Sequence, residues 1–298
     1  MERSKLNWIT GYIWGIADHV LRNVCIVGVL LAPSVLLVAG CAGSNNRVQQ
    51  PEAATQAETR PGPDTLRILA YNIHAGVGMD KEIDLERLAA LIRAVNPDLV
   101  ALQEVDSVTS RTNSVDQAAE LGRLTGLESV FGRFMPYQGG AYGMALLSRW
   151  PIVESQNLRL PDGAEPRTAL TAIVRSPATG QILRFAGIHF YKTDEERMAQ
   201  VEQLEAFLRA DEVPTILAGD FNSTPDSEVM NHLAESWTVI EKGDEHLTFP
   251  SYAPDREIDF VLFRPEGQFE MLDQYLVDEP VASDHRPVVV DLVLQTPG

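Results

Sequence analysis

The sequence predicts an α/β sandwich in which mixed β-sheets carry helices on their outer faces. Short apolar runs alternate with segments of helical periodicity from Thr65 to about Leu294, with no second linker and no internal repeat. The strand-like runs between Tyr142 and His189 follow one another closely, which indicates mostly antiparallel pairing. We therefore predict one domain over residues 65–298, and a chain of this length can bury a large core.

The first elements of this domain form a β-α-β unit. Leu66–Ile73 is an apolar run that predicts a strand. Asp84 then caps a helix whose apolar residues recur on one face, and Asn96-Pro97 ends this helix. Leu99–Val105 is the next predicted strand.

The remainder of the domain is richer in strands than in helices. Turn signals such as Pro151 and Thr179-Gly180 separate the middle strands. A helix is expected from about Glu195 to Leu208, and Pro214 precedes the strand that follows it. The predicted strands are Tyr142–Ser148, Ile152–Leu158, Ala169–Val174, Ile182–His189, Thr215–Ala218, Ile258–Phe263 and Pro287–Leu294.

Charge and cysteine content exclude several classes of function. The formal net charge is -18, so long-range repulsion disfavours a non-specific nucleic-acid binder, although a nuclease with a cationic metal in its site remains compatible. The two cysteines are Cys25 and Cys41. Residues 42–298 therefore hold no disulfide, no thiolate metal site and no cysteine nucleophile.

The N-terminal forty residues predict an export signal. Val24–Gly40 carries no charge, contains Pro33, and is somewhat short for the ~20 apolar residues of a membrane span. Its end, Leu37 to Cys41, resembles the bacterial lipobox, in which small residues precede a cysteine that is lipidated. We predict a lipoprotein signal peptide over residues 1–40, lipidation at Cys41 and an extracytoplasmic domain anchored to a membrane. An uncleaved anchor helix is the alternative, because the region before the apolar run has mixed charge.

Residues 41–64 predict a flexible tether. Gln, Ala, Glu, Thr and Pro dominate this segment, and large apolar residues are almost absent.

Polar residues with catalytic chemistry follow the ends of several predicted strands. Taken singly, each fits a turn residue or a satisfied buried histidine. Together, five strand ends with polar groups in half-buried positions are costly unless those groups converge on a partner, and a metal ion is the natural one. These residues are Asn72, Glu104, His189, Asp220, Asn222, Asp284 and His285.

The ligand types favour a hard divalent cation and phosphoryl chemistry. Carboxylates and an amide oxygen suit Mg²⁺ or Mn²⁺, and no cysteine competes for zinc. Metal, imidazole and amide donors stabilise the negative charge of a phosphoryl transition state. A serine hydrolase is disfavoured because Ser283, Asp284 and His285 are adjacent and no Gly-x-Ser-x-Gly elbow occurs. Gly76-Val77-Gly78 is too short for a phosphate loop.

The motifs together resemble the endonuclease/exonuclease/phosphatase superfamily, the group typified by deoxyribonuclease I. The resemblance covers Leu66 to Leu294, and its most specific part is GDFN followed by SDH. It implies a four-layer α/β/β/α sandwich, two packed sheets with helices on each outer face and the site at one end. Its motifs are YNIH (71–74), LQEVD (102–106), GMALLSRWPI (143–152), GIHF (187–190), GDFNSTPDS (219–227), REIDFVLF (256–263) and SDHRPVV (283–289).

The resemblance also implies a role for each site residue. Metal ligands would be Glu104 and Asn72, with Asp284 close to the ion. The remaining roles are those of catalysis: Asp220 orients and deprotonates water, Asn222 and His189 donate hydrogen bonds to phosphoryl oxygens, and His285, held by Asp259, acts on phosphate or carries a proton.

Three further residues are predicted to contact the substrate. Arg111 and Arg167 have the charge and geometry of phosphate clamps, with a surface salt bridge as the alternative for each. His74 departs from nucleases of the family that have a carboxylate two residues after the Asn, which puts a second metal there in doubt.

These observations predict a divalent-metal-dependent phosphodiesterase or phosphatase acting on a lipid headgroup or small phosphoester outside the cytoplasm. An extracytoplasmic Mg²⁺-dependent nuclease is the rival enzyme. A catalytically inactive binding module of the same fold is the third hypothesis, and no protein partner is predicted.

Overall fold

The computed structural model describes residues 65–177 and 179–295. The predicted signal peptide, lipidation site and tether lie outside these residues. In the part of the chain that is described, no helix is long and apolar enough to cross a membrane.

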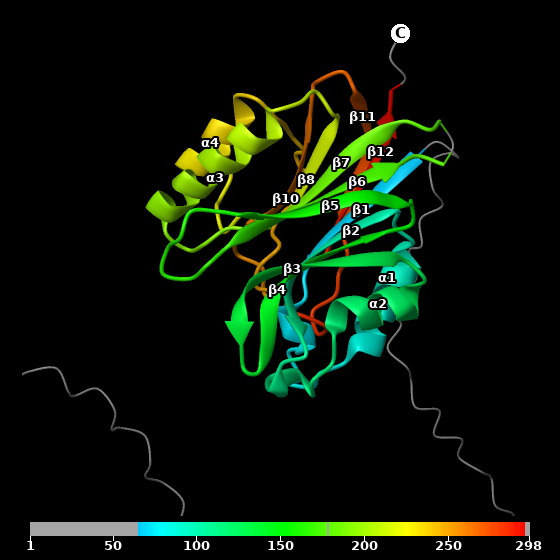
Figure 1. Ribbon diagram of the computed structural model, residues 1–298, viewed down its shortest axis with the longest axis vertical. Helices are drawn as coiled ribbons and strands as arrows, with labels where there is room; N and C mark the ends of the chain where they lie inside the picture. The colour runs from blue at the N-terminus through cyan, green and yellow to red at the C-terminus, as the bar shows by residue number, and fades with distance from the viewer. Residues whose placement is uncertain (1–64, 178, 296–298) are drawn as a thin grey trace, which may run out of the picture. The chain divides into compact units, whose positions relative to one another are not determined.

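Two six-stranded sheets form the centre of the domain (Figure 1). The first sheet contains β1 (Thr65–Asn72), β2 (Leu99–Ser107), β3 (Glu128–Tyr137), β4 (Gly140–Ser148), β11 (Phe269–Leu276) and β12 (Val288–Leu294). The second contains β5 (Ile152–Arg159), β6 (Thr168–Arg175), β7 (Ile182–His189), β8 (Thr215–Asp220), β9 (Thr238–Val239) and β10 (Asp259–Arg264). Their strand orders are β11-β12-β1-β2-β4-β3 and β5-β6-β7-β8-β10-β9.

Helices cover the outer face of each sheet, as Figure 1 shows. The first sheet packs against α1 (Leu85–Val95) and α2 (Gln117–Thr125), and the second against α3 (Asp194–Leu208) and α4 (Glu228–Ala234). Two short 3₁₀ turns, His74–Gly76 and Ser110–Thr112, follow β1 and β2. The predicted four-layer sandwich is confirmed.

Strand β1 shows why the sequence folds in layers. All eight of its residues are buried. Leu66 and Ile68 pack into the core between the sheets, whereas Leu69 and Tyr71 pack beneath α1 and α2. A strand covered on both faces is largely apolar on both, so β1 appears in the sequence as an apolar run in which Arg67, paired with Asp291, is the one charged residue.

The same parallel arrangement occurs once in each sheet. β1 and β2 pair in parallel around the α1 crossover, and β7 and β8 pair in parallel around the α3 crossover. The other pairings within the two sheets are antiparallel. The predicted β-α-β unit and the antiparallel middle region are both confirmed.

Helix α1 begins and ends as its sequence predicts. The Asp84 side chain accepts a hydrogen bond from the backbone N–H of Arg87 at 2.9 Å. Asn96 ends the helix in the left-handed region, at φ 54°, directly before Pro97.

Four longer elements were not predicted: β3, β11, α2 and α4. In β3, Gly132 interrupts the apolar pattern because a side chain there would meet Leu170 of the second sheet at about 3.0 Å. In β11, a register shift between Met271 and Asp273 breaks the alternation that identifies a strand.

The buried Glu205 of α3 ties this helix to α4 and the segment that follows. It accepts hydrogen bonds from His232, Ser236 and Trp237, at 2.9, 2.6 and 3.2 Å. Replacing Glu205 by Ala leaves a buried indole N–H unpaired, so we expect the free energy of unfolding to fall by about 2–3 kcal/mol. Urea unfolding would measure the loss. The exposed Glu202→Ala on the same helix is the control, expected to change stability by less than about 0.5 kcal/mol; an equal effect in both variants would contradict the prediction.

Candidate active site

The polar residues singled out in the sequence meet at one end of the two sheets. Asn72, His189 and Asp220 are the last residues of β1, β7 and β8. Parallel pairing places His189 directly beside Asp220. Asp259 begins β10 opposite Asp220, because these two strands are antiparallel. The end of the sandwich that the sequence predicted as the site is therefore the end where these side chains converge.

Glu104 reaches this end through a bulge in β2. The pairing of β2 with β4 shifts register between Gln103 and Val105, and Glu104 between them has φ 56°. A bulge of this kind turns a side chain away from its regular alternation. Glu104 consequently lies 3.4 Å from the amide nitrogen of Asn72.

Asp220 lies at the centre of the cluster. Its Oδ2 accepts a hydrogen bond from Asn72 Nδ2 at 3.1 Å and lies 3.4 Å from His189 Nε2 and 3.8 Å from His285 Nε2. Its Oδ1 accepts from the backbone N–H of Asn222 at 2.8 Å. One carboxylate thus touches residues from both sheets and from the loop before β12.

Asp259 holds His285 in a defined orientation. Asp259 Oδ2 lies 2.9 Å from His285 Nδ1, and both side chains are buried. Burial by itself lowers the pKa of His285, but the charge and hydrogen bond of Asp259 outweigh burial and raise this pKa to about 10. At neutral pH the ring is therefore protonated, so that Nδ1–H donates to Asp259 and the protonated Nε2 lies 3.8 Å from Asp220 Oδ2.

The pKa of Asp220 and that of His189 are shifted in opposite directions. Burial, followed by repulsion from Asp259, raises the pKa of Asp220 to about 7. Burial, followed by the positive charge of Arg167, lowers the pKa of His189 well below its usual value. His189 is therefore a neutral imidazole at neutral pH, and Asp220 has the basicity of a general base.

The donor set fits a divalent cation. Three carboxylates, those of Asp220, Asp259 and the half-buried Glu104, gather at this end. Crowded, desolvated carboxylates repel one another, and a bound cation removes that cost. The chemistry of the residues is thus that of a metal site with oxygen ligands.

The structure brings together a different trio from the one that the resemblance implied as ligands. Among the described residues, Asp220, Asp259 and His285 place their ligand atoms within 4.8 Å of one another. Of the expected ligands, Asn72 adjoins Glu104 and accepts a hydrogen bond from the His74 backbone N–H at 3.1 Å.

Asp284, the third expected ligand, borders the loop that follows β1. Its Oδ1 lies 3.4 Å from Ser283 Oγ and 3.9 Å from His74 Nδ1. His74 Nδ1 itself lies 3.2 Å from the carbonyl oxygen of Val77. The backbone N–H of His74, which donates to Asn72 Oδ1, also positions the amide of Asn72. No sequence pattern indicated this role.

Ser283 is a site residue that sequence reasoning assigned no role beyond its motif. It is fully buried, and its hydroxyl donates a hydrogen bond to the backbone oxygen of Asn72 at 2.6 Å. This bond fixes the loop that carries Asp284 and His285 to the end of β1. The position of Ser283 directly before Asp284 and His285 was the sequence signal that could have identified it as a site residue.

Arg111 and Arg167 each form the ion pair that was the alternative to a phosphate clamp. Arg111 pairs with Asp106 at 2.6 Å, and Arg167 pairs with Glu165. Neither pair is an ordinary surface salt bridge, because Asp106 and Arg167 are almost completely buried.

Two known proteins are similar to this chain in sequence. The chain is 29% identical over 169 residues to "Uncharacterized protein YbhP" of Escherichia coli K12, which covers 53% of this chain and 67% of that protein. It is 25% identical over 238 residues to the inositol phosphosphingolipids phospholipase C of Schizosaccharomyces pombe, covering 72% and 51%.

Solved structures and a family model agree with these relatives. A crystal structure of an endonuclease/exonuclease/phosphatase from Beutenbergia cavernae superimposes with a TM-score of 0.62 at 26% identity, covering 79% of this chain and 72% of that one. The model of the Endonuclease/Exonuclease/phosphatase family matches residues 69–285, well over half of the sequence. The site at the ends of two packed sheets agrees with this sequence match. The chain belongs to the Endonuclease/Exonuclease/phosphatase family.

Proposed function

We propose that this phosphoester hydrolase is a divalent-metal-dependent phosphodiesterase or phosphatase that acts outside the cytoplasm on a lipid headgroup or small phosphoester. The observation that carries the reaction is the buried carboxylate of Asp220, held between Asn72, His189 and His285. The predicted lipoprotein signal with Cys41 supports the location. The name of the fission-yeast relative, a phospholipase C, supports a lipid substrate.

The proton transfer is assigned to Asp220. Its raised pKa suits a group that orients water and accepts a proton from it as the water attacks phosphorus in line. His285, whose Nδ1 is bound to Asp259, directs Nε2 toward the same place and serves as a donor to phosphoryl oxygen or as the proton carrier. Hydrolysis by this route needs no covalent enzyme intermediate.

Hydrogen-bond donors at the site stabilise the phosphoryl oxygens. His189 is neutral and offers the N–H of Nε2. Asn222 Nδ2 donates one hydrogen to the backbone oxygen of Phe190 at 2.9 Å, which fixes the amide and leaves its second hydrogen for the substrate. Fixed donors of this kind stabilise developing charge without reorganisation during the reaction.

Glu104, Asn72 and Asp284 are the residues that we assign to the cation. Bound Mg²⁺ or Mn²⁺ supplies Lewis-acid polarisation of the phosphoryl oxygens. The proximity of Asn72 to both Glu104 and Asp220 links this ligand set to the base.

Chelation tests the metal dependence. We expect EDTA to abolish hydrolysis of bis(p-nitrophenyl) phosphate and added Mg²⁺ or Mn²⁺ to restore it. Because the ion binds the folded state, its addition is also expected to raise the melting temperature of the EDTA-treated protein. Full activity of the EDTA-treated protein would disprove the metal assignment.

A substrate panel separates the lipid phosphodiesterase from the nuclease. The purified domain with Mg²⁺ would be mixed with supercoiled plasmid, with sphingomyelin or phosphatidylinositol vesicles, and with small phosphomonoesters. We expect lipid or small-ester hydrolysis and no plasmid nicking, since the net charge of -18 repels a polyanion. Plasmid nicking that His285→Ala abolishes would establish the nuclease instead, and an inactive binding module would hydrolyse nothing in the panel.

A further inference from the structure

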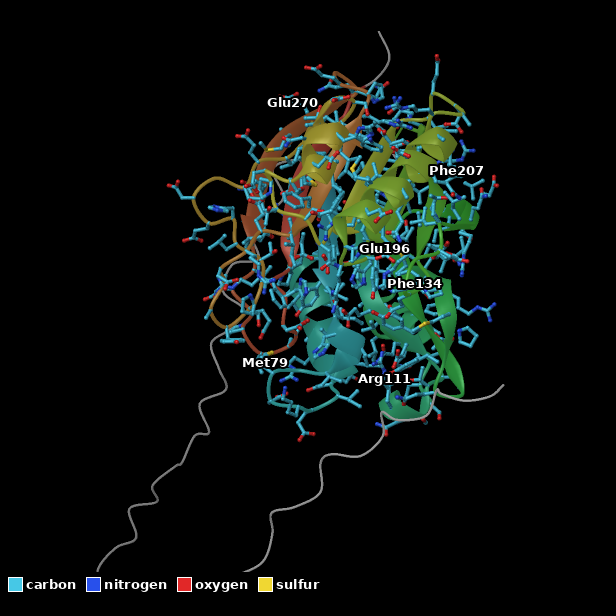
Figure 2. The ribbon with its side chains drawn as sticks, turned by 90° about the vertical axis from the view of Figure 1, so that its left-hand side faces the viewer. Met79, Arg111, Phe134, Glu196, Phe207 and Glu270 are labelled. Carbon is cyan, nitrogen blue, oxygen red and sulfur yellow. The ribbon has the colours of Figure 1, made fainter. Side chains whose placement is uncertain are left out.

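Two arginines flank the ring of Tyr142 at the edge of the active site. The guanidinium carbon of Arg111 lies 5.5 Å from the ring centroid, and that of Arg167 lies 6.0 Å away. Tyr142 lies on β4 opposite Asp106, two residues beyond Glu104 on β2. Figure 2 labels Arg111 together with Phe134 of β3, the strand next to β4. We call the side chains of Arg111, Arg167, Tyr142 and Phe134 the wall of the site, because the two arginines lie against these two rings on β3 and β4.

A buried polar network holds Arg111 in place. Asp106 is fully buried and accepts from Arg111 Nε at 2.6 Å and Nη2 at 2.8 Å. Its Oδ2 also accepts from the buried Thr109 hydroxyl at 2.6 Å, and its backbone N–H donates to the buried Gln117 at 2.8 Å. Burying so many polar groups is costly, and Arg111, 34% exposed, is the member that reaches the surface. The network fixes one edge of the guanidinium and leaves Nη1 for a ligand.

Arg167 is a buried cation with an unsatisfied donor. It is 3% exposed, and its Nε has no partner among the described residues. Its guanidinium lies against the rings of Phe134 at 5.0 Å and Tyr191 at 5.5 Å, and its ion-pair partner Glu165 is a third exposed. An unpaired buried donor is unfavourable, and an apolar side chain among these rings would avoid that cost.

This wall borders the reacting groups. The ring of Phe134 lies edge-on to His189, with centroids 6.2 Å apart. Tyr142 of β4 and Glu104 of β2 lie on neighbouring paired strands, with Tyr142 opposite Asp106. Phe134 therefore connects the two arginines to His189, whose Nε2 lies 3.4 Å from Asp220 Oδ2.

We propose that Arg111 and Arg167 form a second anion subsite, which binds a carboxylate or phosphate that the substrate carries in addition to its scissile phosphoester. The inference rests on the proposed function, which places the scissile group at Asp220. Guanidinium groups bind such anions through paired, charge-assisted hydrogen bonds. Glu165, whose side chain is 33% exposed, pairs with Arg167 in this structure, and we expect the incoming anion to replace it. The second anion belongs to a free metabolite or to a lipid headgroup.

Calorimetry with matched ligands tests the subsite without requiring turnover. Alkylphosphonates of two, three and four carbons would be compared with phosphonoacetate, 3-phosphonopropionate and 4-phosphonobutyrate, in Mg²⁺. We expect the terminal carboxylate to lower Kd at least about tenfold for one chain length. Arg111→Lys, which keeps a charge beside Asp106, and Arg167→Met, which fills the space between the rings, are expected to remove this preference.

The matched control is Arg123→Met. Arg123 forms a comparable ion pair with Glu120 at 2.6 Å on α2, but it is 65% exposed and belongs to no buried network. It is expected to retain the full carboxylate preference. A wild-type protein without the preference, or a preference that survives in both Arg111→Lys and Arg167→Met, would overturn the subsite.

A lipid arm identifies the source of the anion. Hydrolysis would be measured on phosphatidylcholine vesicles that contain phosphatidylserine or phosphatidylethanolamine, whose headgroups differ by one carboxylate. A preference for phosphatidylserine that Arg111→Lys removes supports a lipid headgroup, and a preference confined to the soluble ligands supports a free metabolite. Failure to hydrolyse any phosphoester would refute the proposed function alone, because the calorimetric preference is measured independently.

Discussion

Replacing Asp220 by Asn is expected to lower kcat about 10³-fold. The substitution keeps the size of the side chain but removes the proton acceptor, and general bases of this kind contribute about 10²–10⁴-fold. The single amide oxygen of Asn can still accept the hydrogen bond that Asn72 Nδ2 donates to Asp220 Oδ2 at 3.1 Å. Steady-state kinetics on bis(p-nitrophenyl) phosphate would measure the loss.

Asp226→Asn is the control for this variant. Asp226 lies six residues further along the chain, is exposed, and accepts a hydrogen bond from the Thr224 hydroxyl at 2.6 Å. We expect unchanged kcat for Asp226→Asn and no loss of stability of the metal-free Asp220→Asn protein, because a crowded carboxylate has been neutralised. Retention of wild-type kcat by Asp220→Asn would remove Asp220 from the mechanism.

Replacing Asp291 by Ala is expected to lower the free energy of unfolding by about 3–5 kcal/mol. Asp291 of β12 lies opposite Arg67 of β1 and accepts two hydrogen bonds from it, at 2.8 and 2.7 Å. Their side chains are 1% and 2% exposed. Asp291→Ala removes the carboxylate while the guanidinium of Arg67 stays buried, and a buried charge that has lost its ion-pair partner is unfavourable. Urea unfolding monitored by circular dichroism would measure the change.

Two comparisons make the stability result specific. Glu266→Ala, at an exposed position before β11, is expected to change stability by less than about 0.5 kcal/mol. Replacing both partners, as Arg67→Met with Asp291→Leu, is expected to recover much of the loss, since a buried ion pair is often replaceable by apolar side chains. A single Asp291→Ala variant as stable as the wild type would show that the pair contributes nothing.

Much of the fold was predictable because its central strands are covered on both faces. Burial on both faces makes β1 and β8 largely apolar runs, and the polar residue that ends each run marks the site end of the sheet. Asn72 and Asp220 were therefore visible in the sequence by position alone. The same pattern predicted their convergence with His285, whereas the role of each residue came from the resemblance.

The elements that escaped prediction are shaped by contacts distant in the sequence. Gly132 of β3 accommodates Leu170 of the other sheet, and the bulge in β11 depends on its pairing with β12. Arg111 and Arg167 were each predicted to bind substrate, but their position on the same tyrosine was not. Only the fold places both against Tyr142.

The path of the chain makes the two sheets interdependent. Each sheet contains a parallel pair around one helix, yet β11 and β12 return to the first sheet only after the second has been completed. A chain that stops after β10 lacks two of the six strands of its first sheet, including the direct neighbour of β1. The loop that carries Asp284 and His285 immediately precedes β12. A chain that ends before this loop therefore lacks both the strand that pairs with β1 and the histidine that Asp259 orients.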